Sequence, residues 1–222
     1  MQKLVEGLHK FQSEFFRSHK ELFDSLSKGQ NPEALFITCS DSRIMPNLIT
    51  QTNPGDLFIL RNAGNIVPPY GAAPSGEAAT IEFAVSALGV KHIIVCGHTL
   101  CGAMKGLLNP SSLDKIPAVK SWLTYAESTR RVLEENYPHV EGEARLTVAA
   151  EENVLAQMEN LRMHPSVRAK VARGELAIYG WMYKIESGDV FQFDNAISQF
   201  VRISDGVQPA VSPEILVKRT AI

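Results

Sequence analysis

The chain has 222 residues, of which 22 are lysine or arginine and 24 are aspartate or glutamate, so its formal net charge is −2. This near balance, without a long run of one sign, does not indicate nucleic acid or an anionic membrane surface as a partner, so we expect a small molecule. The length favours one domain with a sizeable core, and three scattered cysteines favour a reducing compartment over a disulfide framework.

The N-terminal residues are expected to form a helical arm. Leu4, Leu8, Phe11 and Phe15 fall on one helical face, and a second helical stretch continues up to Lys28-Gly29. Charged residues interrupt the apolar pattern, so it does not match a secretory signal. No segment approaches the roughly 18 apolar residues of a membrane span, and we therefore expect a cytoplasmic protein with no membrane partner.

Three apolar runs predict short buried strands, and each leads into a polar loop. Residues 35–37 precede the sequence CSDSR, residues 57–60 precede the loop RNAGNIVPPYGAAPSGE, and residues 92–96 precede GHTLCGAMKG. Residues 77–88 are small and apolar on most faces, which predicts a buried helix with Gly89 as its C-cap.

The rest of the chain predicts further alternation of helices and strands. Residues 115–136 and 142–163 indicate two long helices, and ELAIYGWMYKIESGDVFQF indicates two strands joined by a turn at Ser187, Gly188 and Asp189. This order predicts an α/β fold with a mostly parallel central sheet flanked by helices. We assign residues 1–30 to the arm, 31–205 to a single α/β catalytic domain and 206–222 to a C-terminal tail.

A thiol and imidazole set follows two of the predicted strands. Cys39 follows the first strand, and His98 and Cys101 follow the third. If these strands are neighbours, their carboxyl ends bring the three side chains to one point, where two thiolates and an imidazole suit Zn²⁺. No fourth ligand is evident, and three protein ligands with one open position are typical of catalytic zinc. Cys96 ends its strand and is more simply a small buried hydrophobe.

Asp41 and Arg43 stand two and four residues after Cys39. They can face the same side of an extended loop, where the guanidinium would keep the carboxylate ionised and orient it toward the open metal position. The other histidines lack such a setting, and we expect surface or hydrogen-bonded side chains for all five of them: His9, His19, His92, His139 and His164.

The motifs CSDSR, RNAGN and GHTLCGA resemble those of the β-class carbonic anhydrases over roughly residues 1–200. CGAMKGLL at residues 101–108 is similar to the carboxysomal, cyanobacterial type. The resemblance implies one Zn²⁺ per chain held by Cys39, His98 and Cys101, with Asp41 and Arg43 as the catalytic dyad.

The resemblance also implies a substrate pocket. Gln30 matches a glutamine that donates to the substrate from across a dimer interface, and Gly102 matches a glycine beside the zinc. Phe58, Ala63 and Phe83 match positions that line an apolar CO₂ pocket.

The implied reaction is the reversible hydration of CO₂ to bicarbonate and a proton by attack of a zinc-bound hydroxide. Phe36 stands where a bicarbonate-gated subgroup has tryptophan, so the likeness is to the ungated, plant-like subgroup. The implied basic unit is a homodimer in which the N-terminal helices wrap the partner, with tetramers or larger assemblies built from it.

Two alternatives stay open at this point. The first is hydrolysis of CS₂ or COS on the same fold, because both substrates share the linear, apolar shape of CO₂. The second is a non-catalytic zinc protein that serves as a scaffold, for instance one recruited to a carboxysome shell. Catalysis and recruitment by carboxysome scaffold proteins can also coexist, which leaves a free cytoplasmic and a carboxysome-associated location both open.

Overall fold

A computed structural model describes residues 1–72 and 74–204 of the chain. The chain forms two compact units, Met1–Asn31 and Pro32–Ile222, which are taken separately below. The predicted C-terminal tail, residues 206–222, lies outside the described residues. In the part of the chain that the structure describes, no helix is long and apolar enough to cross a membrane.

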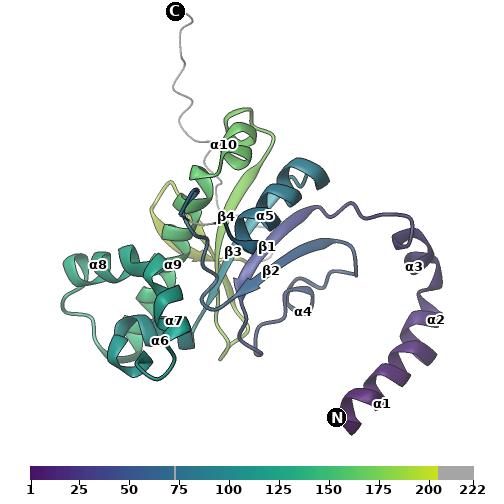
Figure 1. Ribbon diagram of the computed structural model, residues 1–222, viewed down its shortest axis with the longest axis horizontal. Helices are drawn as coiled ribbons and strands as arrows, with labels where there is room; N and C mark the ends of the chain where they lie inside the picture. Colours follow the sequence, from purple (N-terminus) through teal and green to yellow (C-terminus); the bar gives the residue numbers. More distant parts are fainter. Residues whose placement is uncertain (73, 205–222) are drawn as a thin grey trace, which may run out of the picture. The chain divides into compact units, whose positions relative to one another are not determined.

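The first unit is helical, as predicted. It consists of α1 (Gln2–Lys10), a π-helical turn (Phe11–Phe15), α2 (Phe16–Ser18) and α3 (Lys20–Leu26) (Figure 1). The ring centroids of Phe16 and Phe23 lie 4.8 Å apart, and Phe11 packs edge-on against Phe23 at 5.9 Å. No residue of this unit's helices is buried, and Leu4 is 69 % exposed.

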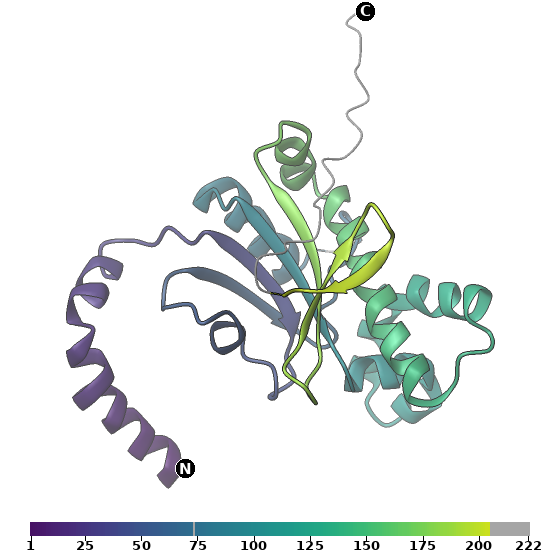
Figure 2. The same cartoon turned by 180° about the vertical axis from the view of Figure 1, so that it is seen from behind.

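The second unit is a single α/β domain built on a sheet, confirming the predicted fold class. In the described residues the sheet has six strands in the order β2-β1-β3-β4-β5-β6, and β6 lies at one edge (Figure 2). The first four are parallel and the last two are antiparallel. The strands are β1 (Ala34–Cys39), β2 (Leu57–Asn62), β3 (His92–His98), β4 (Ala177–Tyr183), β5 (Val190–Asp194) and β6 (Gln199–Arg202). β6 was not predicted.

Helix α9 (Gly142–Met163) has the predicted bounds and packs against β3 and β4. Two glycines permit this close approach. A Cβ atom at Gly97 would lie 2.7 Å from Cγ2 of Val154, and one at Gly180 would lie 2.6 Å from Sδ of Met158. Next to α9 lie α6 (Gly102–Leu108) and α8 (Glu127–Asn136), so these helices gather on one side of the sheet (Figure 1).

Two predicted helices differ from the structure. The predicted helix at 115–136 is wrong as one element, because α7 (Pro117–Trp122), a 3₁₀ turn (Leu123–Ala126) and α8 divide it. The helix predicted at 77–88 consists of α5 (Gly76–Glu82) followed by a π-helical turn (Phe83–Leu88), and it ends at Gly89 as predicted. Its predicted burial is wrong, since only one face is covered and Phe83 is 49 % exposed.

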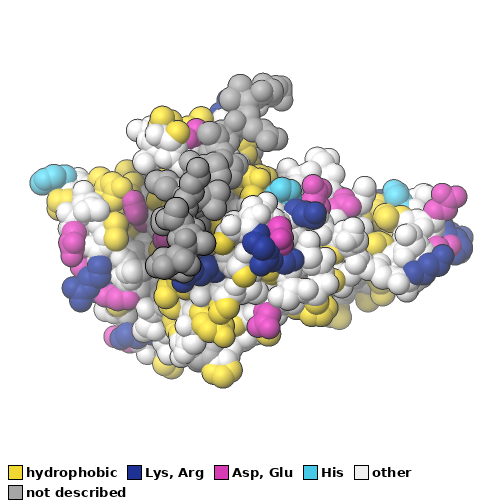
Figure 3. Space-filling model, turned by 90° about the horizontal axis from the view of Figure 1, so that it is seen from above, with side chains coloured by type: hydrophobic (Ala, Val, Ile, Leu, Met, Phe, Trp, Pro, Cys, Tyr) yellow, Lys and Arg dark blue, Asp and Glu magenta, His cyan; other side chains and the backbone are white. Residues whose placement is uncertain are grey.

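Two further short helices precede β2 and β4, namely α4 (Pro46–Thr50) and α10 (Pro165–Ala172). Neither was predicted, since five and eight residues give too little periodicity to identify a helix. On the face shown in Figure 3, basic and acidic side chains are interspersed, in keeping with the net charge of −2.

Candidate metal centre

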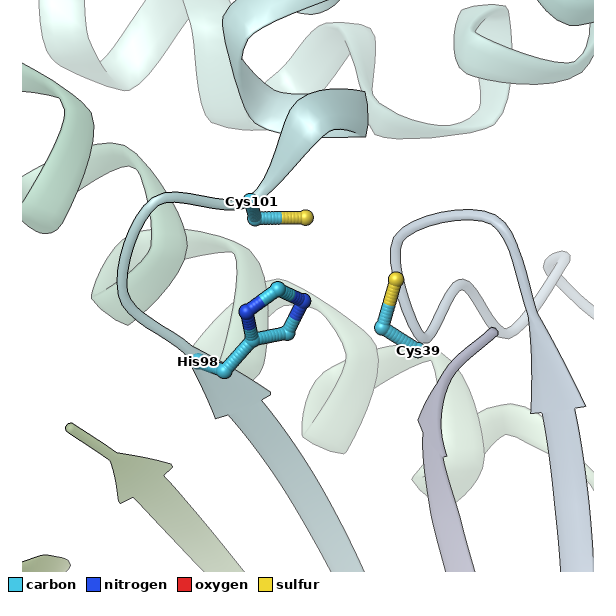
Figure 4. Close-up of side chains that lie close together, drawn as sticks. All are labelled: Cys39, His98 and Cys101. Carbon is cyan, nitrogen blue, oxygen red and sulfur yellow. The ribbon is translucent and has the colours of Figure 1, made fainter. Parts of the chain in front are cut away.

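Two neighbouring parallel strands bring Cys39 and His98 to the same edge of the sheet. Cys39 is the last residue of β1 and His98 the last of β3, and the two strands pair in parallel, which meets the condition that the sequence argument set. The turn after β3 passes through Leu100 at φ 58° and returns Cys101 toward them at the start of α6. The ligand atoms of the three buried side chains all lie within 4.8 Å of one another (Figure 4).

The imidazole of His98 is arranged as a metal ligand. Its Nδ1 lies 2.8 Å from the carbonyl oxygen of Thr99, and because a carbonyl can only accept, Nδ1 carries the proton. The lone pair of Nε2 then has no hydrogen-bond partner among the described residues, although the atom is buried. A metal ion at the centre of the cluster would satisfy it, and a histidine whose other nitrogen donates to a carbonyl is the usual arrangement for a ligand.

The two thiols also suit a cation. The hydrogen bond from Cys101, with a further one from the backbone N–H of Gly64, lowers the pKa of Cys39 to about 4 despite burial. The shared hydrogen bond and burial raise the pKa of Cys101. One sulfur is therefore a thiolate at neutral pH and the other would lose its proton to the metal. A zinc ion, at about 2.3 Å from sulfur and about 2.0 Å from nitrogen, fits a buried set of this kind.

Asp41 and Arg43 form a bidentate ion pair beside the cluster. Nε of Arg43 donates to Oδ1 of Asp41 over 2.9 Å and Nη2 donates to Oδ2 over 2.7 Å. These bonds hold the pKa of Asp41 well below its usual range. Oδ2 also lies 3.9 Å from Nε2 of His98, so the ionised carboxylate faces the metal-binding atoms.

Arg61, which the sequence reasoning missed, supports this loop from β2. Its Nε donates to the carbonyl of Cys39 over 3.0 Å, and its Nη2 donates to the carbonyl of Asp41 over 2.7 Å. It therefore fixes the backbone on both sides of Ser40. A cation at the end of an otherwise apolar strand was the available sequence signal.

Within one chain, only some of the predicted pocket residues lie beside the metal-binding cluster. Gly102 directly follows Cys101, and Ala63 directly precedes Gly64, whose N–H donates to the sulfur of Cys39. Both residues are therefore beside the cluster.

Phe58 and Phe83 lie away from the cluster of their own chain. Phe58 pairs with Leu35 in the sheet, four residues before the Cys39–Asn62 pair, which is about 13 Å along the strand. Its ring lies 6.0 Å from that of the exposed Phe83. Gln30 belongs to the N-terminal unit, where its side chain is exposed.

Comparisons with known proteins all point to the same family. The sequence model of the family described as carbonic anhydrase matches residues 34–190. A carbonic anhydrase of Synechocystis sp. is 52 % identical over 96 % of this chain and 78 % of its own length, and one of Pseudomonas aeruginosa is 45 % identical over 92 % and 93 %.

Two solved structures are similar as well. The β-carbonic anhydrase CcaA superposes with a TM-score of 0.91 at 51 % identity, covering 94 % of both chains. A tetrameric β-carbonic anhydrase of Sordaria macrospora has a TM-score of 0.78 at 31 % identity and covers 86 % of this chain and 95 % of its own.

Proposed function

The chain belongs to the β class of the carbonic anhydrase family, and from this premise we propose that it hydrates CO₂ reversibly to bicarbonate and a proton in a zinc-dependent reaction. The observation that carries the proposal is the buried group of Cys39, His98 and Cys101 with the carboxylate of Asp41 facing it. A site that served only to stabilise the fold would need no oriented, ionised carboxylate beside its ligands.

The three side chains would hold one Zn²⁺ per chain and leave one coordination position for water. Bound zinc supplies a Lewis acid that lowers the pKa of water, to about 7 in the three-histidine carbonic anhydrase that serves as the general example. Two sulfur ligands donate more charge than two imidazoles do. We therefore expect hydration to rise into the alkaline range.

Asp41 orients the attacking oxygen. Because Arg43 keeps it ionised, the carboxylate can only accept hydrogen bonds. Arg43 Nε and its backbone N–H both donate to Oδ1, while Oδ2 receives a single bond from Nη2 and faces the cluster. Oδ2 can thus accept a hydrogen bond from the nucleophile, which stays protonated, and direct its lone pair at the carbon of CO₂.

The pocket is proposed to be completed by a second copy of the chain. The half-buried Phe58 and the exposed Phe83 form an apolar pair away from their own cluster, which suits a contribution to the partner subunit's pocket together with Gln30. Ala63 and Gly102 would contribute from the same chain. An apolar wall accepts CO₂ and offers charged bicarbonate little, which favours release of the product.

We extend the proposal to assembly and location. A homodimer is the unit that this shared pocket requires, and the tetrameric relative of Sordaria macrospora supports larger assemblies. The likeness of residues 101–108 to the cyanobacterial type supports a cytoplasmic, carboxysome-associated enzyme.

A stopped-flow assay with a pH indicator tests the proposal on zinc-quantified protein, from roughly pH 6.5 to 9, a range around the expected water pKa. We expect fast CO₂ hydration that increases with pH. Asp41→Ala should keep about one zinc per chain and lose hydration by about 10²-fold or more.

Asp114→Ala is the matched control, because it also removes an aspartate paired with a cation, Lys120, but on the surface. Its rate should equal that of the unmodified chain. Full zinc occupancy without CO₂ hydration would contradict the proposal. Activity on CS₂ or COS would then favour the alternative of a hydrolase, and no activity on either would favour a non-catalytic scaffold protein.

A further inference from the structure

One peptide unit next to the cluster is held at both ends. The backbone N–H of Gly64 donates to Sγ of Cys39 over 3.4 Å. The carbonyl oxygen of the same peptide, that of Ala63, accepts a hydrogen bond from Nε1 of Trp122 over 2.8 Å. Because a peptide is planar and trans, its N–H and C=O point in opposite directions. Holding the carbonyl therefore also directs the N–H.

The conformation at this point depends on glycine. Gly64 has φ 85°, and a Cβ atom there would lie 3.0 Å from Cβ of Ala103 and 3.3 Å from Cε of Met104. The next carbonyl, that of Gly64 itself, accepts a hydrogen bond from Nδ2 of the buried Asn153 over 2.9 Å. Two side chains from different helices thus hold two successive peptides of the loop, and the first of these peptides donates to the sulfur of Cys39.

We propose that Trp122 is a positioning residue for the metal centre, which aims the N–H of Gly64 at the sulfur of Cys39 through the carbonyl of Ala63. This inference rests on the proposed function only in taking Cys39 as a metal ligand. The hydrogen bond withdraws charge from the sulfur and fixes the direction from which it can bind, as partners of ligands generally do. The bond from the indole polarises the peptide and strengthens its N–H as a donor.

Trp122→Phe tests the proposal, since it keeps an aromatic ring and removes the donor. The probe is Co²⁺ bound in place of zinc, because thiolate-to-Co²⁺ charge transfer reports directly on the sulfur. Without its hydrogen bond the sulfur lone pair is less stabilised, so the charge-transfer band should move to longer wavelength. The Co²⁺ dissociation constant should rise by about 10-fold, the lower end of the usual range for the loss of a ligand's partner.

The other tryptophan of the chain provides the control. Trp181 is also half-buried, and its Nε1 donates to Oε1 of Gln192 over 3.1 Å, on β5 rather than on the loop beside the cluster. Trp181→Phe also removes an indole hydrogen bond, but it should leave the Co²⁺ band and dissociation constant as in the unmodified chain. Thermal unfolding of both metal-free variants reports the stability that each substitution removes.

The outcomes separate this inference from the proposed function. If the unmodified chain shows no thiolate band with Co²⁺, the assignment of Cys39 as a ligand fails. If the band is present and Trp122→Phe leaves both the band and the dissociation constant unchanged, the positioning role of Trp122 is overturned.

An isostere covers the case in which Trp122→Phe does not fold. In the Trp181→Phe background, benzothienylalanine at position 122 replaces only the indole N–H by sulfur and keeps the ring volume. The same band shift is expected, and its absence would overturn the proposal equally.

Discussion

Cys39 and Cys96 are both buried on neighbouring strands, yet their thiols behave differently. Cys39 ends β1, whereas Cys96 lies two residues before the end of β3 and does not end its strand as predicted. Hydrogen bonding from Cys101 lowers the pKa of Cys39 to about 4, whereas desolvation raises the pKa of Cys96 to about 12. Sγ of Cys96 donates to the carbonyl oxygen of Gly97 over 3.5 Å, and the side chain belongs to the buried core. This agrees with the expectation that Cys96 is a packed side chain and not a ligand.

The difference predicts the order of alkylation in the metal-free protein. At about pH 7 iodoacetamide should modify Cys39 first, because the thiolate is the nucleophile. Cys96 should react only after unfolding, and zinc should protect Cys39. Peptide mass spectrometry over time measures this. Equal rates for Cys39 and Cys96 in the folded protein would contradict it.

Asp41 predicts a pH-dependent contribution to stability. The Arg43 guanidinium depresses its pKa in the folded state, so its contribution is complete above the ordinary aspartate pKa of about 3.9 and is lost as the pH falls through the depressed value. In metal-free protein, Asp41→Asn should therefore unfold at lower urea than the unmodified chain at neutral pH, and this difference should shrink below about pH 3.9.

Arg43→Met supplies the comparison for that measurement. Because Arg43 is the main cause of the depressed pKa, Asp41→Asn should have little further effect in the Arg43→Met background. If the stability difference between Asp41→Asn and the unmodified chain grew as the pH fell, the ionised form of Asp41 would not be what stabilises the fold.

At the scale of elements, helix α9 carries a line of polar side chains toward a buried loop. Asn153, Gln157 and Asn160 are spaced by four and three residues and therefore share one helical face. The loop at 63–68 is almost wholly buried without regular secondary structure, so its backbone groups need partners from elsewhere.

Each of these amides makes a bond to that loop. Asn153 donates to the carbonyl of Gly64, Oε1 of Gln157 accepts from the N–H of Val67 over 2.8 Å, and Asn160 donates to the carbonyl of Val67 over 2.8 Å. The amides also bond to one another, Nε2 of Gln157 donating to Oδ1 of Asn153 over 3.0 Å. Helix α9 thus shapes the loop beside the metal centre.

Gln157→Leu tests the importance of this line of amides. The substitution keeps the volume but leaves the buried N–H of Val67 without its acceptor, which should cost about 1–3 kcal/mol of unfolding free energy. Urea unfolding measures the loss. Glu159→Ala, an exposed change on the same helix, should stay within about 0.5 kcal/mol. Equal effects of the two substitutions would rule out the role given to Gln157.

At the scale of the whole molecule, the N-terminal unit exposes an apolar surface. Leu4, Leu8, Phe11 and Phe15 are 69, 52, 39 and 40 % exposed, and they are the residues that the sequence places on one face. An apolar helical face of this extent favours a partner surface, here the second subunit of the proposed dimer.

Leu8→Glu combined with Phe15→Glu should therefore weaken the dimer. Two carboxylates in an apolar interface are costly to desolvate, so sedimentation at micromolar protein should show a lower mass than that of the unmodified chain. The rate of CO₂ hydration should fall as the dimer dissociates, since the proposed pocket needs the partner subunit's Gln30. Gln12→Glu is the control, and an unchanged mass for the double variant would exclude the arm from the interface.

The sequence by itself determined several of the elements and the chemistry that lies within one loop. The apolar runs at 35–37, 57–60 and 92–96 lie within β1, β2 and β3, and the 142–163 pattern matches α9. Periodicity specifies such elements locally. Asp41 and Arg43 pair as expected, because residues two apart in one loop need no distant element to meet.

Only the tertiary structure decided which distant residues meet. The pairing of β1 with β3 was a condition in the sequence argument, and it is the structure that joins Cys39 to His98 and Cys101. The contacts of Trp122 and Asn153 with the loop at 63–68 span 59 and 89 residues of sequence, and the same packing places Phe58 and Phe83 away from their own cluster. Local patterns cannot specify these contacts, because each depends on how helices and strands far apart in the chain pack against one another.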